Sequence, residues 1–126
     1  MIKFAFLINR LPGISVEDFQ RYHRENHAPL FTSIPEADQF VRKYTVSHPV
    51  PASGYPQPAY DGLTEIWFDS WDDHDAFFAS ENYKTKVNPD EKNFIDFTSV
   101  GIMVTNETTI TNVDQSSGPP ALEAAD

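Results

Sequence analysis

The hydrophobic pattern begins with a strand. Residues 2–9 form a nearly unbroken apolar run, with Phe4, Phe6 and Ile8 on one face. A run of this kind is typical of a central strand whose two faces are both covered. The residues Leu11, Pro12 and Gly13 then break the pattern, so we expect the strand to end before them.

An amphipathic helix is predicted next. Ser15 stands at an N-cap position, and Asp18 follows three residues later as a short capping-box partner. We expect the helix to close at residues 26–28, because Pro29 disfavours α geometry in the residue before it. The apolar positions that follow at helical spacing are Val16, Phe19, Tyr22 and His23.

Three more strands are predicted from alternation of polar and apolar residues. They cover residues 39–48, 61–69 and 94–105, and Gly101 in the last one marks a bulge or a close approach. A loop over residues 49–58 contains four prolines and separates the first two of them.

A second helix is predicted after the third strand. Ser70 is its expected N-cap, and Asp73 occupies the capping-box position. Another helical turn is expected after Pro89. The expected buried stripe of the main helix consists of Trp71, His74, Phe77 and Phe78.

The resulting order β-α-β-β-α-β predicts an α+β, ferredoxin-like unit, a split βαβ with a four-stranded antiparallel sheet and helices on one face. Both faces of the predicted strands are apolar, so we expect two copies to pair sheet against sheet. The length of 126 residues fits one domain. We place this domain at residues 1–107 and expect a polar tail, extended or flexible, at residues 108–126.

Composition narrows the range of partners. Nineteen acidic residues against nine Lys and Arg give a net charge of −10, which disfavours binding to nucleic acid and to anionic membrane surfaces. The chain contains no Cys, so disulfides, thiolate metal sites and Cys nucleophiles are excluded. No stretch is long and apolar enough to span a bilayer, and a cytoplasmic location is expected.

Four segments of the chain resemble the EthD family. They are Arg21 to Leu30 (RYHRENHAPL), Val41 to His48 (VRKYTVSH), Ala59 to Phe68 (AYDGLTEIWF) and Ala76 to Ser80 (AFFAS), in the family's order and spacing. The resemblance implies a dimeric α+β barrel in which each subunit encloses an apolar pocket. It also implies a relation to lactone methylisomerases and to polyketide dehydratases or decarboxylases. The isomerases carry a Cys where this chain has Ile66, so a thiol mechanism is excluded here.

Four residues are candidates for catalysis. His27 ends the first helix and matches the family's His-Ala-Pro hallmark. The helix C-terminus raises its pKa and partial burial lowers it, so we expect a pKa near neutral, which suits a group that donates and recovers protons. Tyr44 and His48 share one face of a strand, and the Tyr44 hydroxyl could hold an oxyanion. Glu65 lies among apolar residues, where a raised pKa would make it a general base. For each residue a structural role is the alternative, and for Glu65 this is an ion pair with Arg42.

The expected substrate contacts are Tyr22, Arg42, Asp61, Trp67 and Phe68, although Asp61 also suits a turn before a strand. His23 and His27 have the spacing of a two-His metal site, but no third ligand lies adjacent in sequence. We therefore predict no metal and no cofactor.

The sequence thus favours a cofactor-independent acid–base enzyme, a lyase or dehydratase, an isomerase or a cyclase, acting on a small hydrophobic cyclic or polyketide-like compound. A non-catalytic binding or accessory protein for a hydrophobic metabolite is one alternative. A cofactor-free monooxygenase is the other.

Overall fold

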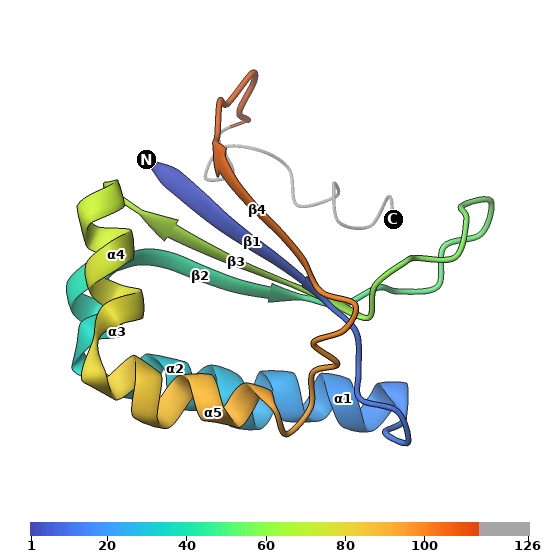
Figure 1. Cartoon of the computed structure of the whole chain (residues 1–126). Coiled ribbons are helices and arrows are strands. Elements are labelled where there is room, and N and C mark those ends of the chain that lie inside the picture. The colour runs from blue at the N-terminus through green and yellow to red at the C-terminus, as the bar shows by residue number, and fades with distance from the viewer. Residues whose placement is uncertain (114–126) are drawn as a thin grey trace.

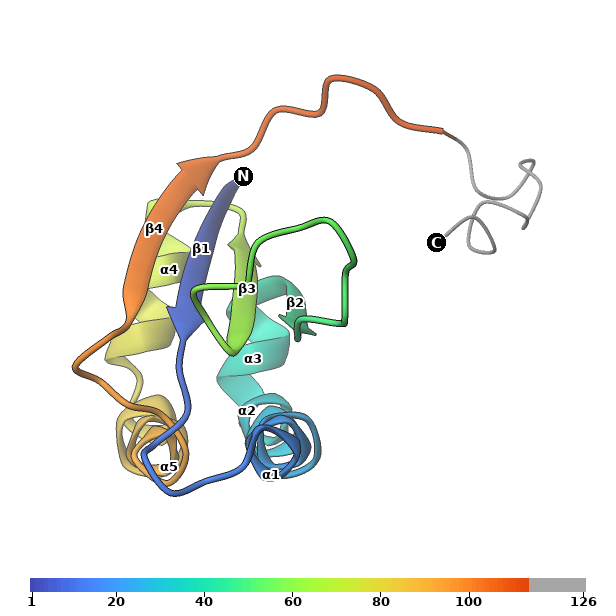
Figure 2. The same ribbon diagram turned by 90° about the vertical axis from the view of Figure 1, so that its right-hand side faces the viewer.

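The computed structural model describes residues 1–113 and consists of one antiparallel sheet with helices on one face (Figure 1). The strands are β1 (Ile2–Ile8), β2 (Val41–Ser47), β3 (Gly62–Phe68) and β4 (Gly101–Asn106). Their order across the sheet is β2-β3-β1-β4 (Figure 2). The two strands that flank the helices of each half are therefore separated by a strand of the other half: β3 lies between β1 and β2, and β1 lies between β3 and β4. This is the predicted ferredoxin-like arrangement.

The register of the strands separates two faces. Phe4 pairs with Ile66 and Phe6 with Thr64, and these side chains point toward the helices. The opposite face, called the open face here, carries the residues between them, among them Lys3 opposite Trp67. Because side chains alternate along a strand, each candidate residue of the sheet is assigned to one face by this register.

The first helical region is longer than predicted. It consists of α1 (Val16–Tyr22), a π-helical turn η1 (His23–His27) and α2 (Ala28–Ser33). The expected end at residues 26–28 is wrong, because the backbone widens at η1: the Ala28 N–H donates to the His23 carbonyl five residues back. Pro29 then falls in the first turn of α2, where a missing N–H has no cost.

The short helix α3 (Pro35–Phe40) was not predicted, and it occupies the start of the strand expected at residues 39–48. The helix α4 (Trp71–Ala79) begins at Ser70 as predicted, with the Ser70 hydroxyl accepting from the Asp73 N–H. Trp71 lies outside the expected buried stripe, since it is 55% exposed. A second π-helical turn, η2 (Tyr83–Val87), and α5 (Asn88–Glu91) complete this region.

The last strand is shorter than predicted. Phe94 and Ile95 are buried before it, and the Asp96 side chain accepts bonds from the Thr98 N–H and hydroxyl. This turn interrupts the expected strand, which begins only at Gly101. A Cβ at Gly101 would lie 2.9 Å from the Tyr60 hydroxyl oxygen, so the predicted close approach is present.

The core between sheet and helices consists of two clusters. One contains Phe31, Ile66, Phe68 and Phe77 among others, and the second is built on Phe6, Ile8, Phe19, Phe94 and Ile95. Within residues 1–113 no helix is long and apolar enough to cross a membrane. The predicted tail begins as an exposed segment without regular structure at residues 108–113, and its remainder lies outside the described residues.

Candidate active site

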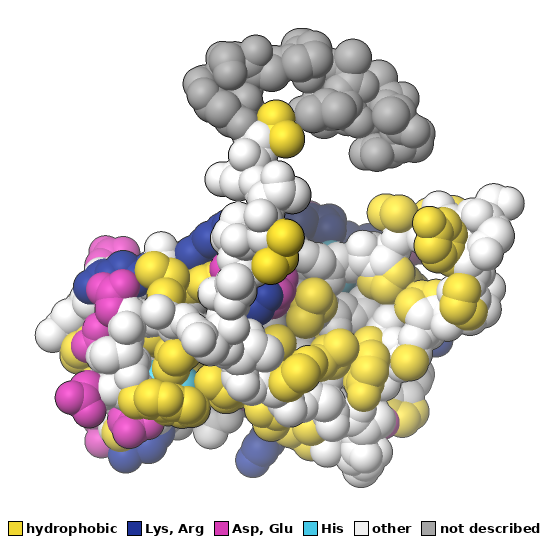
Figure 3. All heavy atoms as spheres, turned by 90° about the horizontal axis from the view of Figure 1, so that it is seen from above, with side chains coloured by type: hydrophobic (Ala, Val, Ile, Leu, Met, Phe, Trp, Pro, Cys, Tyr) yellow, Lys and Arg dark blue, Asp and Glu magenta, His cyan; other side chains and the backbone are white. Residues whose placement is uncertain are grey.

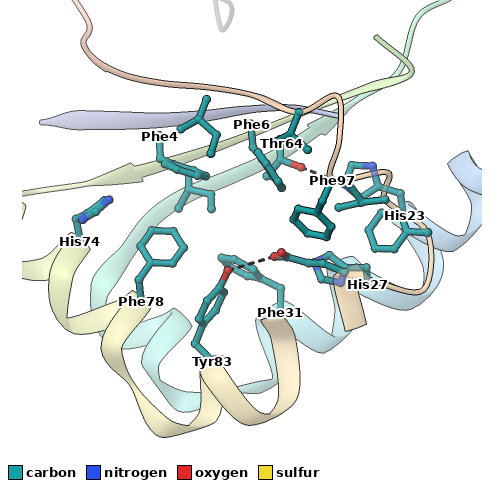
Figure 4. Close-up of a pocket in the computed structure, with 16 residues that line it drawn as sticks. Phe4, Phe6, His23, His27, Phe31, Thr64, His74, Phe78, Tyr83 and Phe97 are labelled. Atoms are coloured by element: carbon teal, nitrogen blue, oxygen red, sulfur yellow. Dashed lines mark hydrogen bonds between the residues drawn. The ribbon is translucent and has the colours of Figure 1, made fainter. Parts of the chain in front are cut away.

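An apolar cavity of about 350 Å³ lies between the sheet and the helices. It is lined by members of both core clusters and by a few polar groups (Figure 4). The lining residues are Phe4, Phe6, His23, His27, Phe31, Thr64, Ile66, His74, Phe78, Tyr83, Glu91, Phe94, Ile95, Phe97, Val100 and Ile102. This size and composition suit a small, largely apolar organic molecule.

His27 is the predicted catalytic residue that the structure places in the cavity wall. It is 6% exposed, and its Nδ1 lies 2.8 Å from the Asp90 carboxylate. Asp90 also accepts hydrogen bonds from the Tyr22 hydroxyl and the Asn93 amide. A carboxylate bound to Nδ1–H fixes the ring orientation and the tautomer, as in hydrolase triads, and leaves Nε2 as the basic nitrogen.

The charges of this pair follow from its surroundings. Burial lowers the pKa of His27 below its usual value, and the bond to Asp90 offsets only part of this effect. Burial opposes the charge on Asp90 as well, but the hydrogen bonds from Tyr22, His27 and Asn93 outweigh it and lower the Asp90 pKa. At neutral pH the pair is therefore a carboxylate holding a neutral imidazole, which can accept a proton at Nε2.

A pair of histidines also reaches the cavity: His23 lines it, and His48 lies behind His23. The Nδ1 of His23 is 2.9 Å from Nε2 of His48, and its Nε2 is 3.0 Å from the Thr64 hydroxyl. Burial and the neighbouring histidines lower the pKa of His23 to about 3, so its ring is neutral. His48 is thus a partner of His23, and its own pKa is lowered by burial and by Arg24.

A buried carboxyl group also reaches the cavity. Glu91 is 8% exposed and accepts a hydrogen bond of 3.1 Å from the Tyr83 hydroxyl (Figure 4). Burial raises the Glu91 pKa to about 7. The nearby charge of Asp90 also raises this pKa, whereas the hydrogen bond from Tyr83 lowers it. Burial and the nearby Glu91 also raise the pKa of Tyr83.

Tyr44 lies one layer behind the cavity. Its ring stacks on Phe31 at a centroid distance of 4.0 Å, and Phe31 separates it from the cavity lining. Its hydroxyl oxygen is buried without a hydrogen-bond partner among the described residues. Burial and the Glu91 charge raise the Tyr44 pKa, which keeps this hydroxyl protonated at neutral pH.

Glu65 and Trp67 lie on the open face, away from the cavity. Glu65 pairs with Lys3 at 2.9 Å, so the expected ion pair with Arg42 is wrong. Arg42 is instead bound to Asp69 at 2.6 Å, because a β-bulge between Val41 and Lys43 moves it out of register. The Trp67 Nε1–H donates to Glu107.

The other expected substrate contacts have structural partners. Asp61 accepts from the Arg10 backbone N–H and guanidinium, which is the turn role that its position also suggested. Phe68 is fully buried in the core and does not line the cavity. Tyr22 does not line the cavity, and its hydroxyl donates to Asp90.

No group of three or more potential metal ligands occurs among residues 1–113. Both ring nitrogens of His23 are engaged by His48 and Thr64, and Nδ1 of His27 is engaged by Asp90. The two-His spacing in the sequence thus reflects one helix face that packs against the sheet.

Sequence reasoning missed Thr64 and, from the second helical region, Tyr83, Asp90 and Glu91. The last three lie in a stretch interpreted as polar and only partly helical. A signal was present, since Glu91, Phe94 and Ile95 have the i, i+3, i+4 spacing of one helical face. A carboxylate on a face shared with apolar residues is a candidate for burial.

The domain model that describes the EthD domain matches residues 11–98, which is most of the chain. The chain belongs to the EthD family. This confirms the resemblance seen in four segments of the sequence, and the match spans both halves of the site, from His23 to Glu91. A comparison with curated proteins gave no significant match.

Solved structures confirm the fold. An EthD family protein from Bacillus halodurans is 19% identical, with a TM-score of 0.66 over 86% of this chain and 99% of its own. An EthD-like protein from Ralstonia eutropha is 18% identical, with a TM-score of 0.63 over 87% and 94%. A protein from Bacteroides fragilis, described as dimeric and ferredoxin-like, is 13% identical, with a TM-score of 0.62 over 84% and 95%.

Proposed function

We propose that this EthD protein is an acid–base enzyme of the lyase, isomerase or cyclase type that acts on a small hydrophobic cyclic or polyketide-like compound without a cofactor. The observation that carries the proposal is the His27–Asp90 pair in the wall of an apolar cavity. His27 removes a proton from a carbon of the substrate at Nε2 and returns it, and Asp90 holds the imidazole in the reactive orientation.

The electrostatics of the cavity support this role. Among its sixteen lining residues there is no Lys or Arg, so the groups able to exchange a proton are imidazole, hydroxyl and carboxyl groups. A neutral imidazole on a carboxylate, shielded from water, has the charge state that a general base requires at neutral pH.

The alternative function is a binding or accessory protein for a hydrophobic metabolite. It is supported by the aromatic rings that make up much of the cavity wall. A carrier needs these rings and the cavity volume, but it has no need of an imidazole fixed by a carboxylate. The two functions therefore differ in whether His27 transfers a proton, which can be measured directly.

The test uses 2-tetralone, a bicyclic ketone with exchangeable protons beside its carbonyl. NMR in D₂O would follow deuterium incorporation with the wild-type protein, His27→Gln and the surface control Glu81→Gln. We expect the wild type and the control to accelerate exchange and His27→Gln to lower the rate by about 10². Binding of 2-tetralone without accelerated exchange would overturn the proposal in favour of a carrier.

We also propose that the protein forms a homodimer through the open face of the sheet. Met103 on this face is 56% exposed. The edge strand β4 that carries it also leaves Ile102 and Val104, which lie on the helix side, 61% and 37% exposed. Figure 3 shows hydrophobic side chains spread over this side of the molecule, with Lys and Arg side chains among them. Such a surface is typical of an interface, and related structures of this fold are described as dimeric.

Sedimentation equilibrium tests the dimer. The wild type should sediment as a dimer, and Met103→Arg should shift it toward the monomer because a charge would be buried between the sheets. Val50→Arg is the matched control, since Val50 is 76% exposed in the loop after β2. A wild-type monomer, or equal weakening by both variants, would contradict this interface.

A further inference from the structure

Glu91 is the carboxyl group among the lining residues of the cavity, and the His27–Asp90 pair does not account for it. Its carboxyl group is buried, and the Tyr83 hydroxyl is its hydrogen-bond partner among the described residues. No Lys or Arg of residues 1–113 forms an ion pair with it. A buried carboxylate without a cation is unfavourable, so the position disfavours a purely structural role.

We propose that Glu91 is a second catalytic residue, the general acid that protonates the carbonyl oxygen of the substrate while His27 removes the proton from the adjacent carbon. This inference rests on the proposed acid–base function and adds the group that receives the developing negative charge. It also specifies the substrate class: an uncharged ring compound with a carbonyl oxygen and an acidic carbon–hydrogen bond beside it.

The geometry supports different roles for the adjacent residues Asp90 and Glu91. Asp90 and Glu91 follow each other on α5; Asp90 reaches the Nδ1 side of His27, whereas Glu91 lines the cavity. Tyr83 and His27 both line it from the helices below the sheet, and the hydrogen bond from Tyr83 to Glu91 is drawn on that side (Figure 4). The base and the acid thus reach one bound molecule from one helical layer.

The reaction balances without another reactant. The carbon–hydrogen bond breaks, its proton moves to Nε2 of His27, and its electron pair forms the carbon–carbon double bond of the enol. The carbonyl π pair moves to the oxygen, which takes the proton of Glu91. Reversal at the same carbon gives exchange, and return of the proton to a different carbon gives isomerisation.

The groups packed around Glu91 determine the pH range of this step. Besides burial, the charge of Asp90 on the same helix raises the Glu91 pKa, and the hydrogen bond from Tyr83 of η2 lowers it. Tyr44 from β2 also faces this group, since the Glu91 charge raises the Tyr44 pKa. Burial raises the Glu91 pKa to about 7, whereas burial lowers the pKa of His27 below its usual value. The acid form of Glu91 and the base form of His27 therefore coexist between the lowered pKa of His27 and about pH 7.

The experiment compares the pH–rate profile of 2-tetralone exchange in the wild type, Glu91→Gln, His27→Gln and the matched surface control Glu81→Gln. The wild-type and control rates should fall tenfold per pH unit above about pH 7. Glu91→Gln should lower the rate at pH 6 by about 10² and remove this alkaline limb. A ¹³C NMR titration, with Glu91→Gln assigning the signal, should place the carboxyl midpoint near pH 7.

The outcomes separate the two proposals. If Glu91→Gln keeps the wild-type rate and alkaline limb while His27→Gln loses activity, the role of Glu91 is overturned and the proposed function stands. A Glu91 carboxyl that titrates near its ordinary value of 4.5 also overturns that role. If wild type and His27→Gln exchange at equal rates, the proposed function itself fails.

Discussion

The stability of the protein should depend on the charge of Glu91, whatever the substrate is. The ordinary carboxyl pKa of 4.5 applies in the unfolded chain, whereas burial raises it to about 7 in the fold. Between these values the folded state holds a proton that the unfolded state has released, so stability falls as the pH rises through this window. At about 1.4 kcal/mol per pH unit, the total loss is about 3 kcal/mol.

Glu91→Gln isolates this effect, because Gln has the same shape, stays neutral and can still accept the Tyr83 hydrogen bond. Urea unfolding followed by circular dichroism from pH 4 to pH 8.5 gives the difference in unfolding free energy between variant and wild type. This difference should shift by about 3 kcal/mol in favour of the variant as the pH rises from 4.5 to 7 and then stay constant. Contributions of other groups cancel in the difference. A difference that is flat across the window, as expected for Glu81→Gln, would refute the burial argument.

Three further variants test other parts of the site. His23 has a pKa lowered to about 3, so the wild type should lose about 5 kcal/mol of stability as the pH falls from 6.5 to 3, and urea unfolding of His23→Leu should lack this slope. Asp90→Asn should slow 2-tetralone exchange by about 10² to 10⁴, because an amide that donates to Nδ1 favours the wrong tautomer of His27. Phe31→Ala should lower the unfolding free energy by about 3 to 5 kcal/mol in the same urea assay, since Phe31 is 3% exposed in the core.

The fold was largely predictable because its signals are local. The N-caps at Ser15 and Ser70 identified where two helices begin, and alternation identified the sheet strands. The errors occur where a tertiary contact overrides the local pattern. Phe94 and Ile95 have the composition of a strand, but they are buried in the core ahead of β4. Phe40 alternates with the residues of β2, yet it ends the short helix α3, which Pro35 begins.

The site was less predictable, because its residues meet only after the chain has folded. His27 was found from its local context. Glu65 is equally surrounded by apolar neighbours in sequence, but the register of β3 turns it to the open face. Alternation divides a strand into two faces and does not say which one the helices cover. The choice between Glu65 and Glu91 therefore required the tertiary structure.

The two π-helical turns explain how two distant helical segments each contribute a buried residue to the cavity. η1 ends at His27 and is followed two residues later by Pro29; η2 ends at Val87 and is followed in the same way by Pro89. A proline cannot donate to the carbonyl four residues back, and its ring crowds that carbonyl, which favours a wider turn just before it. In each half of the fold the wide turn is followed, four residues after its end, by a buried residue that lines the cavity, Phe31 in one half and Glu91 in the other. A π-helical turn followed by a proline thus places the Phe31 ring of one helix and the Glu91 carboxyl group of the other in the wall of the same cavity. The corresponding sequence pattern is a histidine two residues before a proline in the first helical region and two acidic residues directly after a proline in the second. This pattern can be used to search for the same type of site in other ferredoxin-like chains.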